Sequence, residues 1–258
     1  MNKNVSIAIT AALVMNGGIV NAQEATNIGK HNITLSKDVM TPETLWAMGR
    51  IGSAQASPDG NKIVYQVGYY SVKENRGHQV IYVMDSDGQN VRQLTTSAKS
   101  EGSPVWLDNH TIAFLLDGQI WSMNSDGTNR KKLSSSDIEI EGFRFSPDGK
   151  KVLLIKSIPY YGTIKKNPSD LPKASGRLIT DMNYRHWDHY VETIAHPFVA
   201  EVTANGISKN DVDIIEGEPY ESPLAPFGGI EQFDWSKDSK QIAYTCRKKE
   251  GVKYAVST

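Results

Sequence analysis

The segment ASPDGNKIVY at residues 56–65 decides the fold, because its pattern returns three times along the chain. The later copies are FSPDGKKVLL at 145–154, WSKDSKQIAY at 235–244 and, one residue shorter, WLDNHTIAF at 106–114. Self-similarity at a spacing of roughly 40 to 50 residues is typical of repeat architectures. The chain is therefore expected to consist of repeated structural units.

Each copy has the composition of a tight turn followed by a strand. Pro58 restricts the backbone at the first corner of the turn, and Asp59 and Gly60 supply a side-chain acceptor and a permissive backbone. The β-branched and aromatic residues at 63–65 then favour an extended strand. The repeated unit therefore begins with a β-turn that leads into a sheet.

A second pattern follows the first two copies along the chain. It reads IYVMDSDGQNVRQLT at 81–95 and IWSMNSDGTNRKKLS at 120–134. A strand, an Asp-Gly turn and another strand make a hairpin, and two such strand pairs make a unit of about four strands. A four-stranded unit of this length is the blade of a β-propeller, so the sequence predicts an all-β propeller fold.

The string DSDGQN at 85–90 also has the spacing of an acidic calcium loop. The acidic ligand expected further along such a loop is absent, and a hairpin turn accounts for the string. We therefore expect no metal and no cofactor.

Composition places the chain among ordinary globular proteins. Of 258 residues, 39% are hydrophobic and 22% are charged, and the formal net charge is -1. This charge provides no electrostatic basis for binding nucleic acid or an anionic membrane, so neither partner is expected. The single cysteine, Cys246, excludes an internal disulfide, and its position in an apolar run predicts a buried strand residue.

Residues 1–22 have the features of a signal peptide. Lys3 provides the positive start, residues 5–14 are mostly apolar, and VNA at 20–22 fits a small-x-Ala cleavage site. The apolar stretch is too short to span a bilayer, and the alternative is a buried N-terminal helix. The sequence therefore predicts export to a periplasm or to the outside of the cell.

The remaining chain divides into a leader and a partial propeller. Residues 23–49 are expected to form a leader with a short helix in TPETLWAMG at 41–49, where Thr41 can cap the helix and Gly49 can end it. Residues 50–258 are expected to form about four blades, the last incomplete, as the N-terminal part of a longer protein. The third blade carries an insertion at about 159–192; the alternative is an additional blade with an unrecognisable pattern.

The densest group of functional residue types lies inside this insertion, in YRHWDHYVE at 184–192. Arg185 can bind a carboxylate or a carbonyl, Trp187 offers a flat apolar wall beside Tyr184, and Asp188 or Glu192 can anchor a cation. These five residues are the candidate substrate-binding residues. No Gly-x-Ser-x-Gly motif, P-loop or dinucleotide fingerprint is present, so no catalytic residue is predicted.

Two other interpretations of this group remain open. His186, His189 and His196 could bind a metal, but their spacings of three and seven differ from the spacing of four that is usual on a helix. Alternatively, Arg185 and Asp188 pair with each other and the neighbouring tryptophan belongs to the core of a blade.

Four features together carry a family resemblance. They are the Ser-Pro-Asp-Gly repeats, the opening MTPETLWAMGR at 40–50, LPKASGRL at 171–178 and YRHWD at 184–188. With them the chain resembles the propeller part of dipeptidyl peptidases in the prolyl oligopeptidase family. The repeats alone are equally similar to TolB-like periplasmic propellers.

The resemblance implies a secreted or periplasmic serine exopeptidase that removes dipeptides from peptide N-termini. In that family the propeller caps a C-terminal α/β-hydrolase domain that holds the catalytic triad. That domain is missing from this sequence, so the chain alone is expected to be inactive. The implied partners are peptide substrates and the hydrolase domain, the propeller would gate access and anchor the peptide N-terminus, and a homodimer is left open. The alternative function is that of a TolB-like, non-enzymatic interaction module.

Overall fold

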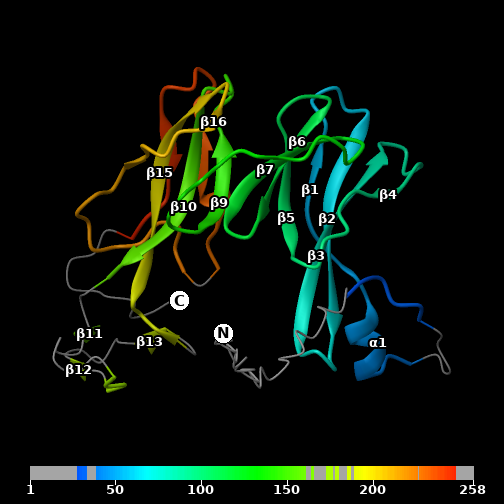
Figure 1. The fold of residues 1–258 in the computed structure, drawn as a ribbon, viewed down its shortest axis with the longest axis horizontal. Coiled ribbons are helices and arrows are strands. Elements are labelled where there is room, and N and C mark those ends of the chain that lie inside the picture. Colours follow the sequence, from blue (N-terminus) through cyan, green and yellow to red (C-terminus); the bar gives the residue numbers. More distant parts are fainter. Residues whose placement is uncertain are drawn as a thin grey trace, which may run out of the picture.

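The computed structural model describes residues 28–33, 39–160, 164–165, 173–176, 178–179, 185–186, 189–225 and 227–247. Antiparallel sheets dominate this part of the chain and stand side by side along the long axis of the molecule (Figure 1). One short α-helix precedes them. The prediction of an all-β fold is therefore confirmed.

The first two sheets each contain four strands in sequential order. Sheet one comprises β1 (Arg50–Ala56), β2 (Lys62–Ser71), β3 (Arg76–Asp85) and β4 (Arg92–Gln93). Sheet two comprises β5 (Glu101–Trp106), β6 (Thr111–Leu116), β7 (Gln119–Asn124) and β8 (Lys131–Lys132). This up-and-down order is that of a propeller blade.

Sheet three has the order β16-β15-β10-β9, and β17 also pairs with β15. Its strands are β9 (Ile140–Phe145), β10 (Lys151–Pro159), β15 (Thr193–Thr203), β16 (Gly206–Ile207) and β17 (Val212–Asp213). After a short 3-10 helix (Ile230–Gln232), β18 (Phe233–Trp235) and β19 (Ile242–Tyr244) begin sheet four. The described residues thus form blades of an incomplete propeller and do not close a ring.

The insertion leaves and re-enters one hairpin of sheet three. β10 and β15 pair without a break from Lys151↔Glu201 to Pro159↔Thr193, so residues 160–192 connect two adjacent strands. Within this connection, β11 (Ile164–Lys165) pairs with β12 (Leu178–Ile179), and β13 (Arg185–His186) pairs with β14 (His189–Tyr190). The predicted domain boundaries remain a prediction.

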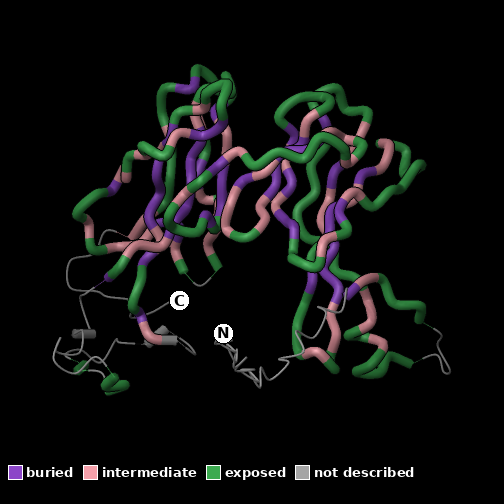
Figure 2. Tube along the Cα trace, in the orientation of Figure 1, coloured by how far each residue is buried: buried purple, intermediate pink, exposed green. Residues whose placement is uncertain are grey.

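The hydrophobic core lies between facing sheets. Alternate residues of β10 point to opposite sides, so Val152 and Leu154 pack toward sheet two while Leu153 and Ile155 pack toward sheet four. Buried residues accordingly follow the middle strands of each sheet (Figure 2). A continuous apolar run is the expected pattern for a strand that is covered on both faces.

The repeated turns share one arrangement of hydrogen bonds. The Ser57 hydroxyl donates to Asp59 Oδ1 at 2.6 Å and accepts from the Lys62 amide at 2.9 Å, and Gly60 has a φ of 72°. The Ser146 hydroxyl makes the corresponding bonds to Asp148 Oδ1 at 2.7 Å and from the Lys151 amide at 2.9 Å. The turn and strand that the repeat predicts are therefore present.

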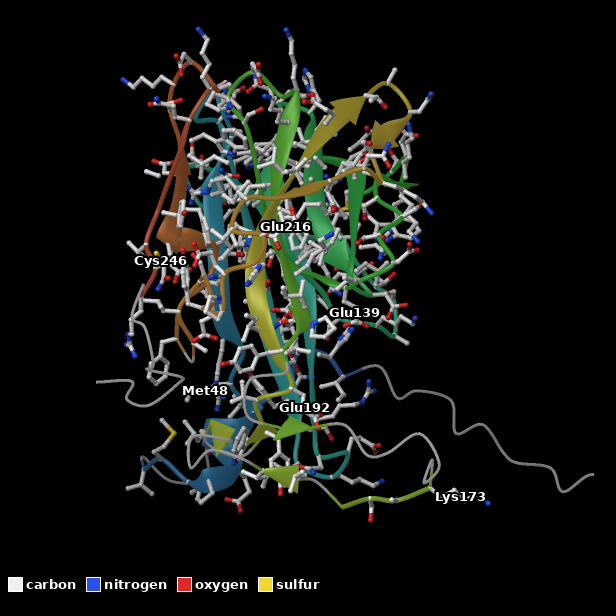
Figure 3. All side chains as sticks on the ribbon, turned by 90° about the vertical axis from the view of Figure 1, so that its left-hand side faces the viewer. Met48, Glu139, Lys173, Glu192, Glu216 and Cys246 are labelled. Atoms are coloured by element: carbon white, nitrogen blue, oxygen red, sulfur yellow. The ribbon has the colours of Figure 1, made fainter. Side chains whose placement is uncertain are left out.

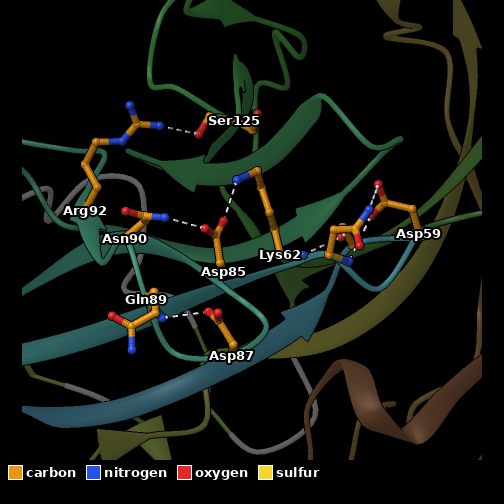
Figure 4. A network of polar contacts seen from close by, with 10 residues as sticks. Asp59, Lys62, Asp85, Asp87, Gln89, Asn90, Arg92 and Ser125 are labelled. Atoms are coloured by element: carbon orange, nitrogen blue, oxygen red, sulfur yellow. Dashed lines mark hydrogen bonds and ion pairs between the residues drawn. The ribbon is translucent and has the colours of Figure 1, made fainter.

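The string at 85–90 forms a hairpin turn with its carboxylates bonded to nearby groups (Figure 4). Asp85 accepts from Lys62 Nζ at 2.7 Å and from Asn90 Nδ2 at 2.6 Å, and Asp87 Oδ1 accepts from the Gln89 amide at 2.9 Å. The Asn90 bond, followed by the Lys62 ammonium, lowers the pKa of Asp85. The turn geometry thus explains why the string has this sequence.

Helix α1 (Pro42–Ala47) begins as predicted and ends earlier. The Thr41 hydroxyl accepts from the Thr44 amide at 3.2 Å, and Pro42 occupies the first turn. The helix stops at Ala47, with Met48 in an extended conformation, so Gly49 is not its terminator. No helix in the described ranges is long and apolar enough to cross a membrane.

The prediction for Cys246 was wrong. Strand β19 ends at Tyr244, and the cysteine lies beyond it with intermediate exposure. The pairing of β19 with β18 ends at Phe233↔Tyr244. Cys246 follows two residues later and therefore has no partner strand in the described part of this sheet.

Candidate functional site

The candidate site lies at the end of sheet three where β10 and β15 give rise to the insertion. The ladder ends at Pro159↔Thr193, and the Tyr160 amide then donates to the Glu192 carbonyl at 2.8 Å. The Glu192 amide donates to the Tyr190 carbonyl at 3.0 Å. These bonds hold the two ends of the insertion together at the edge of the sheet.

A small hydrophobic cluster closes the same end. Tyr160, Val191 and Ile194 are buried together, and Ile158 packs against them. Because the cluster draws residues from both ends of the insertion, it fixes the point from which the segment leaves the sheet. The base of the candidate site is therefore rigidly attached to β10 and β15.

Of the five predicted site residues, the structure describes Arg185 and Glu192. Arg185 lies in β13, where its backbone is the register partner of Tyr190 in β14. Glu192 is exposed at the base of the insertion. Tyr184, Trp187 and Asp188 lie outside the described residues. The structure therefore places Arg185 and Glu192 at one end of sheet three, joined through the β13–β14 hairpin.

The three histidines of the metal interpretation occupy different settings. His186 and His189 are register partners on paired strands, and not residues of one helix. His196 is fully buried in β15, and its Nδ1 lies 2.8 Å from Asp213 Oδ2. Among the described residues, no group of three or more His, Cys, Asp or Glu side chains is placed to hold a metal.

A buried ion pair lies behind the candidate site and was not predicted. Lys156 is the register partner of His196, and its ammonium lies 2.7 Å from Asp211 Oδ2 and 3.8 Å from the centre of the Phe198 ring. The sequence feature that could have predicted this pair is Lys156 itself, which follows the apolar run 152–155 within one strand. Such a lysine must find a partner when both faces of the sheet are covered. With the His196–Asp213 pair, it attaches residues 211–213 to the sheet.

The insertion and the leader helix lie at the same end of the sheets. In Figure 1, α1 is at the lower end of sheet one and β13 is at the lower end of sheet three. Figure 3 shows Glu192 and Met48, the residue after α1, at this end when the molecule is turned. The Ser-Pro-Asp-Gly turns join the opposite ends of the strands, so Glu192 and α1 share the end that the repeated turns do not occupy.

Comparisons with known proteins identify the relatives of this sequence. No protein-family profile matches the chain. Dipeptidyl-peptidase 5 of Porphyromonas gingivalis is 41% identical over 263 aligned positions, which cover 100% of this chain and 37% of that protein. Dipeptidyl-peptidase 5 of Porphyromonas endodontalis is 36% identical, with 87% of this chain and 33% of that protein covered.

A solved structure of TolB from Acinetobacter baumannii aligns with a TM-score of 0.43 and 16% identity, covering 76% of this chain and 37% of that protein. The chain spans about a third of the length of the curated relatives that it matches, in their N-terminal portion. The resemblance to dipeptidyl peptidases that the four sequence features carry together is thereby confirmed: over its whole length, this chain is similar to the N-terminal portion of the dipeptidyl-peptidase 5 proteins.

Proposed function

We propose that this chain is the propeller portion of an exported dipeptidyl peptidase, and that its insertion anchors the N-terminal end of the peptide substrate. The observation that supports this most directly is the attachment of the insertion. Its two ends are bonded to each other at the Tyr160–Glu192 step and packed into a buried cluster, so the insertion is attached to the sheet at a defined point.

The residue types of the insertion suit this ligand. The free N-terminus of a peptide is a cation that carboxylates recognise, and Asp188 and Glu192 supply two of them. Arg185 can donate to a peptide carbonyl, while Trp187 and Tyr184 can pack against the first side chains. Bond cleavage would take place in an α/β-hydrolase domain outside this sequence, with the propeller limiting which peptides reach it.

The test uses the protein expressed from the whole open reading frame that contains this sequence. Arg185→Gln and Glu192→Gln are compared with Lys173→Gln, an exposed residue of the same insertion. A charge-assisted hydrogen bond contributes about 1.5–3 kcal/mol, so each site variant should lower kcat/KM for a dipeptidyl p-nitroanilide by roughly 10- to 100-fold. The loss should appear mainly in KM, because the anchor binds ground state and transition state alike.

Three results would contradict the proposal. The first is a wild-type KM in both site variants, and the second is equal cleavage of substrates with a free and an acetylated N-terminus. The third is an open reading frame without a strand–Gly-x-Ser-x-Gly–helix unit beyond residue 258, which would leave the non-enzymatic interaction module as the better function.

Export is tested separately. The proposal expects the mature protein to begin at Gln23, after cleavage behind the VNA motif at 20–22. Mass spectrometry of the N-terminal peptide from periplasmic and culture fractions checks this. A protein that keeps Met1 and stays in the cytoplasmic fraction would refute export.

A further inference from the structure

A cavity of about 370 Å³ lies beside α1 at the lower end of sheet one (Figure 1). Its lining comes from α1, from the start of β1, and from the facing ends of β2 and β3 with the turn between them: Trp46, Arg50, Tyr70, Ser71, Val72, Asn75, Arg76 and Gly77. We infer that this cavity binds a carboxylate that is attached to an apolar or aromatic group, such as the end of a peptide. The inference does not depend on the proposed function.

The Arg50 guanidinium is oriented by two aromatic rings. Its Cζ lies 4.9 Å from the centre of the Trp46 ring and 4.4 Å from the centre of the Tyr70 ring. The two rings themselves meet edge to face, with centroids 5.7 Å apart and planes at 64°. A guanidinium that stacks on aromatic faces keeps the N–H groups along its edge for an acceptor, and this planar fork matches a carboxylate.

The walls of the cavity are fixed by backbone bonds. β2 and β3 pair along their whole length to Ser71↔Arg76, and the turn is closed by the Asn75 amide, which donates to the Val72 carbonyl at 3.2 Å. The Ser71 hydroxyl accepts from the Glu74 amide at 3.1 Å. On the other side, the Thr41 cap holds α1. A site held in this way loses little conformational entropy when a ligand binds.

The charge of the lining selects the ligand class. Arg50 brings a guanidinium group, and no lining residue carries a carboxylate. The apolar part of the ligand is accommodated by Trp46, which is 41% exposed, and Val72, which is 69% exposed. An anion with a flat or apolar neighbour therefore fits, whereas a bare inorganic anion would leave the apolar walls in contact with water.

The experiment is calorimetric titration of the protein expressed from the whole open reading frame with N-acetyl-phenylalanine and, separately, with its neutral amide. The acid should bind with a Kd of roughly 1 mM, and the amide should not bind measurably at about 10 mM. Arg50→Gln should abolish binding of the acid, and Arg50→Lys should weaken it at least about threefold, because lysine keeps the charge and loses the fork. Arg92→Gln is the matched control, since Arg92 donates to the Ser125 carbonyl away from the cavity.

Thermal unfolding of each variant shows whether the fold is retained, so that a loss of binding can be assigned to the site. Acid and amide binding with equal affinity, Arg50→Gln binding like the wild type, or no binding of the acid to the wild type at about 10 mM would each overturn the inference. Because activity is not measured, failure here leaves the proposed function of the insertion untouched.

Discussion

At the scale of single residues, the most repeated interaction is the serine–aspartate pair of the turn. In each of three turns, the serine hydroxyl donates to the aspartate two residues later, at 2.6 Å from Ser57, 2.7 Å from Ser146 and 2.6 Å from Ser236. The same hydroxyls also accept a backbone amide at the start of the next strand. One side chain thus closes the turn and fixes where the strand begins.

Because of this serine–aspartate pair, the free energy of unfolding depends on pH in the acidic range. The serine hydroxyl, followed by a backbone amide, lowers the pKa of Asp59, Asp148 and Asp238 below the ordinary value of 3.8. A carboxylate whose pKa is lower in the folded state stabilises the fold above its unfolded pKa and loses this contribution as pH falls through the folded pKa. We therefore expect the free energy of unfolding to decrease as pH falls below about 4.

Asp148→Asn should flatten this acidic decrease, because the amide cannot titrate. Urea unfolding at a series of pH values between roughly 6 and 2 measures the slope for the wild type and the variant. Asp137→Asn, at an exposed position, is the control and should leave the slope unchanged. An equally steep decrease in Asp148→Asn would show that the turn carboxylate does not contribute to the acid sensitivity.

At the scale of elements, β10 is the strand on which sheet three is built. It pairs with β9 on one side and β15 on the other, and both of its faces are covered by neighbouring sheets. Its burial explains why a strand of nine residues can carry the insertion while its pairing with β15 stays in register. The insertion extends a ladder that is already stabilised by the buried residues 152–156 of β10.

Leu154→Ala tests the role of this strand. Leu154 is 1% exposed and packs in the cluster between sheets two and three. A truncation of this kind leaves a cavity and costs about 2–5 kcal/mol, so the midpoint of urea unfolding should fall clearly. Val212→Ala, at 64% exposure on β17, should change the free energy of unfolding by less than about 0.5 kcal/mol. Similar midpoints for the two variants would contradict the description of β10 as a core strand.

At the scale of the whole molecule, neighbouring sheets are joined by repeated contacts between equivalent positions. The Trp106 indole N–H donates to the Gln55 carbonyl at 3.1 Å, and the Trp235 indole N–H donates to the Arg144 carbonyl at 3.1 Å. The Asp59 amide donates to Asn109 Oδ1, and the Asp148 amide donates to Ser239 Oγ, both at 3.0 Å. These bonds set the spacing of the sheets at their inner strands and at their turns.

Sheet one has an edge at its inner strand, β1, which meets sheet two at Gln55. Every residue of β1 is exposed, Ile51 reaches 72% exposure, and within the described ranges the strand forms a ladder only with β2. An exposed strand edge with an apolar side chain favours pairing with another chain. We therefore expect the isolated 258-residue chain to self-associate.

Ile51→Lys should reduce this association, because a charge on an edge strand disfavours pairing. Sedimentation velocity at increasing protein concentration measures the mass distribution. Val91→Lys, at an exposed position beside β4, serves as the control and should leave the distribution as in the wild type. A purely monomeric wild-type chain would refute the prediction.

The sequence by itself determined the elements that local chemistry specifies. The Ser-Pro-Asp-Gly turns, the two Asp-Gly hairpins and the start of α1 could all be predicted, because Pro58, Gly60 and Thr41 act on their immediate neighbours. The positions of the third and fourth sheets could be predicted from the repeat copies at 145–154 and 235–244. The end of α1 and the setting of Cys246 could not be predicted, because they depend on where pairing and packing stop.

Only the tertiary structure decided which distant residues meet. The pairing of Lys156 with Asp211 and the Trp235 bond to the Arg144 carbonyl join positions that share no local pattern. Burial is the physical reason, since a polar group that is removed from water must find a partner wherever the packed sheets bring one. For the same reason, the predicted binding segment was recognised from its residue types, whereas its place at the end of β10 and β15 emerged only from the strand register.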